Sequence, residues 1–392
     1  MHRVGRIHGI LLDCYSILYI GDQSAHFLLC AVERKFMTSR DASDGSASDA
    51  VDLSTEAVAA LVATHYGSAI GELTLLGAES STVCRAQAID GSVMAVKIFW
   101  DRADSAETIR WQHEVVSRLA ESGLPVARPI RAVDGALTAV GEVDGRPVLL
   151  QASEWLVGTP LEDAPPTTPL LREVGRTAAR LHGALLREKA PAGLPVHDWE
   201  ITRSRSTIDA AVREIRYASE HRFPTAEGFP SVERLLAVAD DVCRLLRDCV
   251  EPLLATLPRA VVHHDLHDSN LLVGSLQDPA RVVGILDFGD MLESVRISEP
   301  IIAAAYAARN SREPLAAVRE VLTGWSESVP VTAAESTVVL PLAAARLTAN
   351  AAVWSSRLGS SRAAYAAARM RGSVRTAELL LHGLDERAPH PA

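Results

Sequence analysis

Cysteine is scarce in this chain of 392 residues, and its few copies are scattered. They are Cys14, Cys30, Cys84, Cys243 and Cys249, and no two of them form a CxxC pair. An odd and dispersed set argues against a disulfide framework and against a cysteine zinc site. Such a set is typical of reduced thiols, so the sequence predicts a cytoplasmic protein.

The chain also lacks an excess of basic residues and any long apolar run. Its formal net charge is −10, which argues against the basic footprint of a nucleic-acid-binding protein. The apolar runs near the N-terminus, at 10–12, 17–20 and 27–32, are interrupted and too short to span a bilayer. We therefore expect neither nucleic acid nor a membrane as partner. The acidic balance would suit an amino-bearing small molecule.

Two apolar runs flanked by oxygen-bearing side chains form the most informative stretch. Residues 261–273 read VVHHDLHDSNLLV, and residues 282–290 read VVGILDFGD. Asp265 and Asn270 lie just before the apolar residues 271–273, and Asp287 ends the second apolar run. One hairpin could therefore bring the three side chains together. Such oxygens suit Mg²⁺, and phosphoryl transfer also needs a carboxylate to take the acceptor's proton. The stretch therefore predicts Asp265 as catalytic base and Asn270 and Asp287 as metal ligands.

This stretch resembles the motifs of the aminoglycoside phosphotransferase family, the protein-kinase-like small-molecule phosphotransferases. That family shows His-Gly-Asp-x-His-x-x-Asn and then a strand ending in Ile-x-Asp. Here His263, Asp265, His267 and Asn270 match, while His264 replaces a glycine, which tolerates torsions that histidine resists. The run ILDFGD is similar to the hydroxylysine kinase branch of the family.

The resemblance implies an α+β fold with two lobes, an antiparallel-sheet N-lobe and a mainly helical C-lobe. It implies transfer of the γ-phosphoryl group of ATP or GTP, with Mg²⁺, to a hydroxyl of an amino-bearing metabolite. Similarity to the hydroxylysine kinases favours 5-hydroxylysine or a related amino alcohol. Aminoglycosides, homoserine and choline-type acceptors stay open, because one scaffold hosts them all.

Residues 51–153 carry the signals of the N-lobe. A short amphipathic helix is expected over 54–66, with Ser54 as its N-cap. Strands follow in ELTLLG, STVCRAQAID and SVMAVKIFW, with an Asp-Gly turn at 90–91 that favours a hairpin. A helix over 103–122 and two more strands around a second Asp-Gly turn, at 144–145, complete a predicted five-stranded antiparallel lobe with one helix.

Lys97 lies on one of these strands among apolar neighbours, where a buried charge needs a partner. By the resemblance, Lys97 pairs with Glu114 on the following helix and holds the nucleotide phosphates.

Two further segments are expected at the nucleotide. Loop 77–82 lacks the GxGxxG pattern, but its backbone and the hydroxyls of Ser81 and Thr82 could cradle phosphate oxygens. Glu154 and Leu156 stand where the family has the linker between the lobes, so main-chain groups there would face the base.

Residues 154–392 are expected to form the C-lobe. Helical periodicity marks 170–186, 235–257 and three alanine-rich helices at 313–325, 333–357 and 362–382, and a further helix is expected to begin at Ser298, with this serine as its N-cap. Four residues are candidates for the acceptor site. His267 belongs to the motif, while Asp290 and Glu293 follow it and could attract an ammonium group. Arg346 is the candidate for a bidentate contact to an acceptor carboxylate.

A nucleotide-binding pseudokinase is the alternative function. The intact set of Lys97, Asp265, Asn270 and Asp287 favours an enzyme over that alternative. A protein kinase is less favoured, because the glycine-rich loop and an APE-type segment are missing.

The first fifty residues fit no pattern found downstream. Met37 opens MTSRDASDGSASDA, a composition typical of a flexible terminus. We predict an N-terminal extension over 1–50, with the functional chain beginning near Met37. Deleting residues 1–39 should leave folding and catalysis unchanged.

Overall fold

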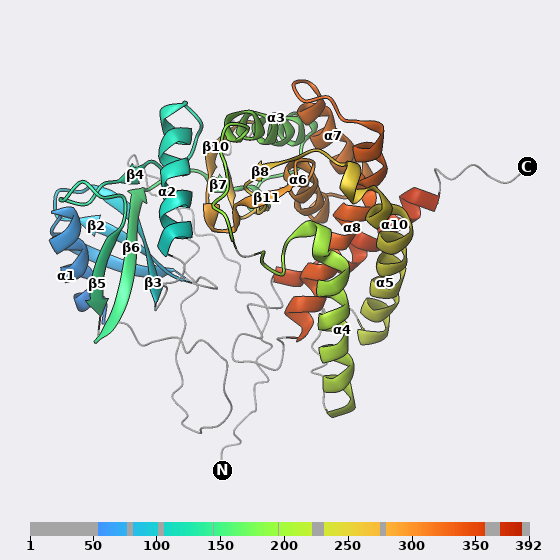
Figure 1. The fold of residues 1–392 in the computed structure, drawn as a ribbon, viewed down its shortest axis with the longest axis horizontal. Helices are drawn as coiled ribbons and strands as arrows, with labels where there is room; N and C mark the ends of the chain where they lie inside the picture. Colours follow the sequence, from blue (N-terminus) through green and yellow to red (C-terminus); the bar gives the residue numbers. More distant parts are fainter. Residues whose placement is uncertain are drawn as a thin grey trace, which may run out of the picture. The chain divides into compact units, whose positions relative to one another are not determined.

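The computed structural model describes residues 54–76, 81–100, 106–143, 145–194, 196–221, 231–274, 280–356 and 369–385. The predictions for residues 1–50 and for loop positions 77–80 lie outside the described residues. Strands dominate up to residue 160 and helices dominate after it, which confirms the α+β fold (Figure 1). Two apolar cores are present, one within 58–152 and a larger one within 115–380.

The N-lobe sheet has six antiparallel strands in the order β1-β2-β3-β6-β4, with β5 paired to β6. They are β1 (Ile70–Leu76), β2 (Thr82–Ala88), β3 (Val93–Trp100), β4 (Pro129–Ile130), β5 (Ala139–Val143) and β6 (Arg146–Glu154). Five strands were predicted, so the count is wrong by one. The additional strand is β4, which contains Pro129, a residue read from the sequence only as a helix breaker. A proline suits this place because an edge strand can do without one backbone N–H.

Alternation along β3 decides which way Lys97 points. Met94, Val96 and Ile98 are buried in the N-lobe core, so Lys97 lies on the opposite face of the sheet. The core face is covered by helix α1 (Thr55–Tyr66), whose predicted N-cap is confirmed because the backbone N–H of Ala57 donates to Ser54 Oγ at 3.1 Å. Lys97 is thereby free to face the C-lobe.

Helix α2 (Ala106–Glu121) joins the two lobes. Gln151, which pairs with Lys97 across β6, donates to the carbonyl of Ile109 in α2 at 3.0 Å. The C-terminal half of α2 packs instead into the larger core. The loop after it reaches strand β10, where the backbone N–H of Ile285 donates to the Pro125 carbonyl at 2.7 Å. The second core thus begins before the predicted lobe boundary at residue 153.

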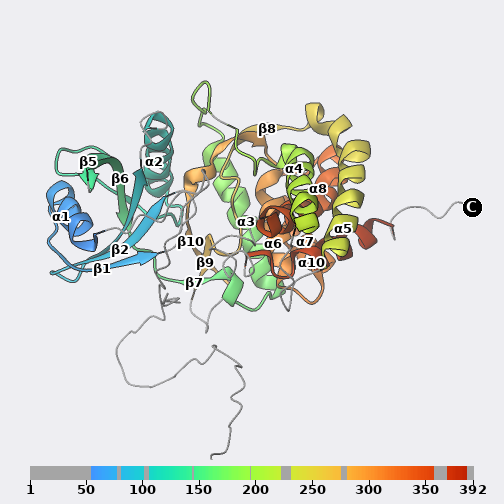
Figure 2. The ribbon, with the colours of Figure 1, turned by 90° about the horizontal axis from the view of Figure 1, so that it is seen from below.

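Helices build the C-lobe around α8. They are α3 (Thr168–Leu185), α4 (Ser204–His221), α5 (Val232–Leu245), α6 (Ser298–Arg309), α7 (Pro314–Ser326), α8 (Ala333–Ser356) and α10 (Ser373–Asp385). Helices α4, α5, α6 and α10 all pack on α8 (Figure 2). Within the described ranges, α8 alone is long and apolar enough to cross a membrane, but 83% of its apolar window is buried in the protein, as expected of a core helix.

Two of the helices differ from the sequence prediction. The helix expected over 235–257 ends at Leu245 and continues as a π-helical turn (Leu246–Val250) and a 3₁₀ turn (Glu251–Thr256). Pro252 accounts for the break, because proline cannot donate within a helix. Helix α4 was not predicted as an element of its own.

Short strands place the predicted motif. Strand β8 (Arg259–Val262) leads into the loop 263–270 and pairs with β11 (Leu292–Val295). Strands β9 (Leu271–Val273) and β10 (Val282–Ile285) form the predicted hairpin, and β7 (Thr159–Pro160) pairs with β9. The linker before β7 passes so close to β9 that a Cβ on Gly158 would lie 2.9 Å from Leu272 Cβ.

Candidate active site

The loop 263–270 has a left-handed backbone at His264, the position where the family pattern has glycine. Its φ is 68°, which costs a residue with a side chain of order 1–3 kcal/mol. Two contacts hold it there. The His264 backbone N–H donates to Glu299 Oε1 at 2.8 Å, and His264 Nε2 accepts from the backbone N–H of Ile201 at 3.1 Å. The histidine thus keeps the glycine-like conformation because its ring and its amide are both bound.

Glu299, on α6, was missed by sequence reasoning. It is fully buried under the loop, and burial raises its pKa to about 8. From the sequence, Ser298 was taken as the N-cap of this helix. The structure places the N-cap at Ile297, so the expected cap is wrong and the following acid turns into the core. The one signal in the sequence that could have indicated a buried role for Glu299 was its place in the first turn of an otherwise apolar helix.

Asp265 is held through both carboxylate oxygens. Oδ1 accepts from Arg346 Nη2 at 2.8 Å, Oδ2 accepts from Asn270 Nδ2 at 2.9 Å, and His267 Nε2 lies 3.4 Å from Oδ2. Burial alone would raise the pKa of Asp265, but His267 and Arg346 outweigh burial and hold it below its usual value. With 16% of its side chain exposed, Asp265 is an ionised, fixed and accessible carboxylate.

Asn270 and Asp287 come together at the open end of the β9–β10 hairpin. The backbone N–H of Leu286, next to Asp287, donates to the Asn270 carbonyl at 2.9 Å. The side-chain amide nitrogen of Asn270 is used on Asp265, which leaves its amide oxygen for another partner. Asp287 has a left-handed backbone (φ 54°) and 49% of its side chain is exposed.

This donor set fits a hard divalent ion such as Mg²⁺, which prefers carboxylate and amide oxygens and keeps sites for phosphate oxygens or water. Across the described parts of the chain, no group of three or more His, Cys, Asp or Glu residues forms a metal cage. A metal here would therefore be held by Asn270 and Asp287 together with oxygens that a nucleotide brings.

Lys97 pairs with Asp287 and not with Glu114. Lys97 Nζ lies 2.8 Å from Asp287 Oδ1, and this cation lowers the pKa of the Asp287 carboxyl. Glu114 is exposed, so the predicted Lys97–Glu114 pair is wrong in this structure. The buried face of α2 at this level instead carries Gln112, which donates to the Gly289 carbonyl at 2.6 Å, and His113.

The other nucleotide candidates are placed but their contacts with a nucleotide stay predictions. Ser81 and Thr82 begin β2, where Thr82 Oγ1 accepts from the indole of Trp100 at 3.2 Å. Glu154 ends β6 with an exposed side chain, and Leu156 is half-buried in the linker that follows.

Of the two predicted ammonium ligands, the structure brings only Asp290 into the cluster. It ends the 3₁₀ turn Phe288–Asp290, and its backbone carbonyl lies 3.2 Å from His197 Nε2. Burial, aided by the charge of Asp265, raises the pKa of Asp290 to about 6. Glu293 is different: it lies on β11 with 59% of its side chain exposed, and its neighbour is Arg259 Nε at 3.7 Å.

The structure places Arg346 against Asp265. Its side chain is only 4% exposed, Nη2 binds Asp265, and Nη1 donates to the Trp199 carbonyl at 2.9 Å. Each terminal nitrogen thus already has a protein partner, and the bidentate contact to an acceptor carboxylate stays a prediction. His267 is also buried, and its Nδ1 accepts from the backbone N–H of Ser269 at 3.1 Å, so it supports the loop.

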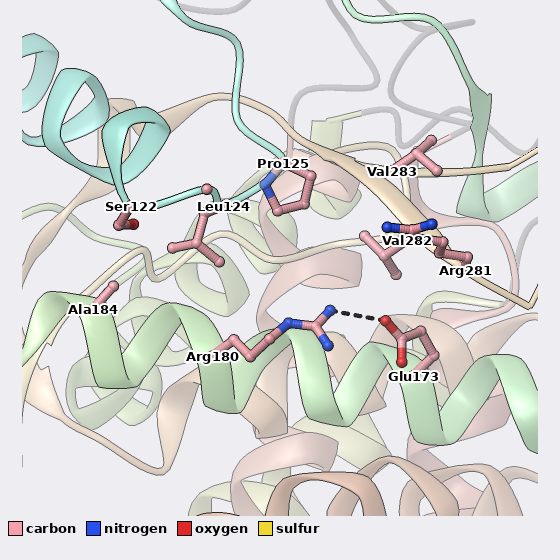
Figure 3. Close-up of a pocket in the computed structure, with 10 residues that line it drawn as sticks. Ser122, Leu124, Pro125, Glu173, Arg180, Ala184, Arg281, Val282 and Val283 are labelled. Carbon is pink, nitrogen blue, oxygen red and sulfur yellow. Dashed lines mark hydrogen bonds and ion pairs between the residues drawn. The ribbon is translucent and has the colours of Figure 1, made fainter.

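A cavity of about 560 Å³ lies elsewhere, between the loop after α2, helix α3 and strand β10 (Figure 3). Leu124, Pro125 and Val282 face it, and Arg180 Nη2 donates there to Glu173 Oε1 at 2.8 Å. It contains none of the residues predicted for the site.

A carboxylate base, two metal-type oxygens and a phosphate-type lysine thus converge at the junction of a strand lobe and a helical lobe. Residues 72–329 match the family model described as the phosphotransferase enzyme family. The chain belongs to the phosphotransferase enzyme family. Lys97, Asp265, Asn270 and Asp287 all fall within the matched span.

Individual proteins agree with this family assignment. A hydroxylysine kinase of Xenopus laevis is 27% identical over 236 residues, covering 58% of this chain and 60% of that enzyme. The chain thus spans about 60% of the length of this relative. A structure of an amicoumacin kinase with AMP-PNP, Ca²⁺ and Ami has a TM-score of 0.59 at 15% identity, covering 83% of this chain and 93% of that one.

A microcompartment-associated aminopropanol kinase has a TM-score of 0.56 at 17% identity, over 83% of this chain and 97% of that chain. At these identities the two structures show a shared fold. The phosphotransferase family fold predicted from the motif is thereby confirmed.

Proposed function

We propose that this phosphotransferase family member transfers the γ-phosphoryl group of ATP or GTP to a hydroxyl of an amino-bearing metabolite, 5-hydroxylysine or a related amino alcohol. The observation that carries the proposal is the fixed, ionised Asp265 bound to Asn270, next to the β9–β10 hairpin that leads to the ion pair of Asp287 with Lys97. These groups can do the two tasks of phosphoryl transfer, which are positioning and charge neutralisation.

In this proposal Asp265 orients the acceptor hydroxyl and takes its proton as the oxygen–phosphorus bond forms. Lys97 leaves Asp287 and binds phosphate oxygens of the nucleotide. Asn270 and Asp287 would hold Mg²⁺, which neutralises charge on the phosphates. Ser81 and Thr82 would line the phosphates, and main chain near Glu154 and Leu156 would face the base.

Asp290 supports an amine on the acceptor. In the parts of the chain that the structure describes, its carboxylate makes no hydrogen bond or ion pair, yet burial has raised its pKa to about 6. A carboxylate partly desolvated beside another acid gains most from a cation. An acceptor with its amine next to its hydroxyl would place the hydroxyl at Asp265 and the ammonium at Asp290. The relatives named hydroxylysine kinase and aminopropanol kinase point to the same acceptor class.

The other expectations from the sequence also stay proposals. A cytoplasmic location rests on the scattered cysteines, and the expectation of neither nucleic acid nor a membrane as partner rests on charge and on the lack of long apolar runs.

The test is nucleotide consumption by the purified full chain with Mg²⁺. The acceptor panel should contain 5-hydroxylysine, 1-amino-2-propanol, ethanolamine, homoserine, choline and an aminoglycoside, each with ATP and with GTP. We expect the highest kcat/KM for an acceptor with a primary amine next to its hydroxyl, with a phosphorylated product visible by mass spectrometry. Nucleotide binding without consumption for any acceptor would favour the pseudokinase instead.

A further inference from the structure

Arg346 and Asp265 form a buried pair that the proposed mechanism does not use. Arg346 comes from the centre of α8, 81 positions along the chain from Asp265, and its Nη2 lies 2.8 Å from Asp265 Oδ1. This contact occupies the oxygen opposite to the one that Asn270 binds. Each carboxylate oxygen has further lone pairs, so the acceptor hydroxyl can still reach Asp265.

The guanidinium group is itself fixed on several sides. Nη1 donates to the Trp199 carbonyl at 2.9 Å, and the guanidinium carbon lies 5.2 Å from the centre of the Trp199 ring and 5.8 Å from that of the Tyr306 ring. The planar fork of arginine permits this double contact, which a flexible ammonium group would not hold in one plane. Because the guanidinium group is fixed, it restrains the orientation of the Asp265 carboxylate that it binds.

Stability is a poor explanation for this pair. Burying a guanidinium costs several kcal/mol, and apolar replacement of a whole buried ion pair is often neutral or stabilising by roughly 1–4 kcal/mol. Arg346 Nε is buried without a hydrogen-bond partner among the residues that the structure describes, a further cost. Asp265 also shares the site with the acids Asp287 and Asp290, which would repel an unrestrained carboxylate.

We propose that Arg346 is a positioning residue for the catalytic base: it holds the Asp265 carboxylate in the orientation that accepts the acceptor's proton. The inference rests on the proposed function, because it assigns Arg346 a role through Asp265. Because Arg346 would act through Asp265, its effect should appear in kcat and not in the KM for nucleotide.

A double-mutant cycle tests this role. The four proteins are wild type, Arg346→Met, Asp265→Asn and the double variant, measured for kcat with the best acceptor and for the Kd of a non-hydrolysable nucleotide. Arg346→Met should lower kcat by about tenfold or more, up to the roughly 10²–10⁴-fold typical for loss of the base itself. In the Asp265→Asn background the same change should cost less than about threefold, because residues that act as a unit are non-additive.

Arg296→Met is the matched control. Arg296 Nε lies 2.8 Å from the buried Glu335 at the start of α8, and among the described residues its side chain binds Glu335 and the Pro330 carbonyl, not Asp265. Its effect on kcat should be the same in the wild-type and Asp265→Asn backgrounds. If Arg346→Met does not fold, Arg346→Lys replaces it in the cycle. This variant keeps the charge, loses the planar fork, and should lower kcat in the wild-type background but not in the Asp265→Asn background.

Two results would overturn the inference: a folded Arg346 variant with kcat within about threefold of wild type, or full additivity with Asp265→Asn. A wild type that phosphorylates no acceptor would contradict the proposed function, and the cycle would then be measured on slow hydrolysis of nucleotide by water, which Asp265 would also orient.

Discussion

The two aspartates of the site differ in how they are held. Asp265, on the acceptor side, has contacts from an arginine, an asparagine and a histidine, and 16% of its side chain is exposed. Asp287, on the nucleotide side, is 49% exposed, and its side chain contacts only Lys97 and the backbone N–H of Gly289 among the described residues. One carboxylate is built into the helical lobe, and the other lies at the open junction with the strand lobe.

This difference suggests an order of assembly. In the proposed function, the base would be in place before substrates bind, because the partners of Asp265 come from the C-lobe. The nucleotide side would be completed only on binding, because Lys97 would exchange Asp287 for phosphate oxygens and Asp287 would exchange Lys97 for a metal. Preorganising the base lowers the cost of reaching the transition state, while an open nucleotide side allows the substrate to enter.

The largest expected effect comes from removing the base. Asp265→Asn should lower kcat by roughly 10²-fold or more, the usual scale for a general base. The Kd of a non-hydrolysable nucleotide, measured by calorimetry, should stay close to that of wild type because the nucleotide side is built separately. A kcat near the wild-type value would remove Asp265 from this role.

Removing Lys97 should have the opposite signature. Lys97→Met loses a charged contact to phosphate, worth about 1.5–3 kcal/mol, so the Kd for nucleotide should rise by roughly tenfold or more. The KM for the acceptor should change little, since Lys97 lies on the face of β3 that serves the nucleotide side. An equal rise in the Kd for nucleotide and in the KM for the acceptor would contradict separate nucleotide and acceptor sides.

Acceptor binding should depend on pH through Asp290. Its pKa of about 6 means that the carboxylate is charged above that pH and neutral below it. The KM for an amine-bearing acceptor should therefore rise as pH falls from about 7 to 5, and Asp290→Asn should show a high, flat KM over the same range. The Kd for nucleotide, measured in parallel, serves as control. A pH-independent wild-type KM would argue against an ammonium at Asp290.

The smallest effect concerns stability. The folded protein binds a proton at Glu299 more tightly than the unfolded chain, because the Glu299 pKa is about 8 compared with an ordinary 4.5. The stability from this proton is full below about pH 4.5 and is lost as pH rises through about 8. Glu299→Gln cannot ionise at this position. The melting temperature of this variant, relative to that of wild type, should therefore rise by a few degrees as pH increases from 5 to 8. A difference in melting temperature between the two proteins that stays constant from pH 5 to 8 would contradict a buried proton at Glu299.

Much of the site was predictable, because its chemistry is local in sequence. Asp265, Asn270 and Asp287 are separated by short apolar strands, so their spacing alone indicated one hairpin, and the β9–β10 pairing confirms it. Lys97 was predictable because a charge inside an alternating strand must face away from the core.

The misses all depend on long-range packing. The partner of Lys97 was assigned to the acid on α2, but polar Gln112 and His113 take the buried face there, and polarity does not identify a buried helix position. The contact of Arg346 with Asp265 was missed because the sequence cannot show that a guanidinium reaches a carboxylate 81 positions away. Glu299 was missed for the same reason, since its role is set by a loop 35 positions earlier.

A crystal structure of the complex with Mg²⁺ and a non-hydrolysable nucleotide would test the central claim most directly. The account predicts that Lys97 Nζ moves beyond about 4 Å from Asp287, the limit of an ion pair. It also predicts that Arg346 Nη2 stays at its present 2.8 Å from Asp265 Oδ1. A Lys97–Asp287 pair that persists beside bound nucleotide, or an Asp265 carboxylate that leaves Arg346, would contradict it.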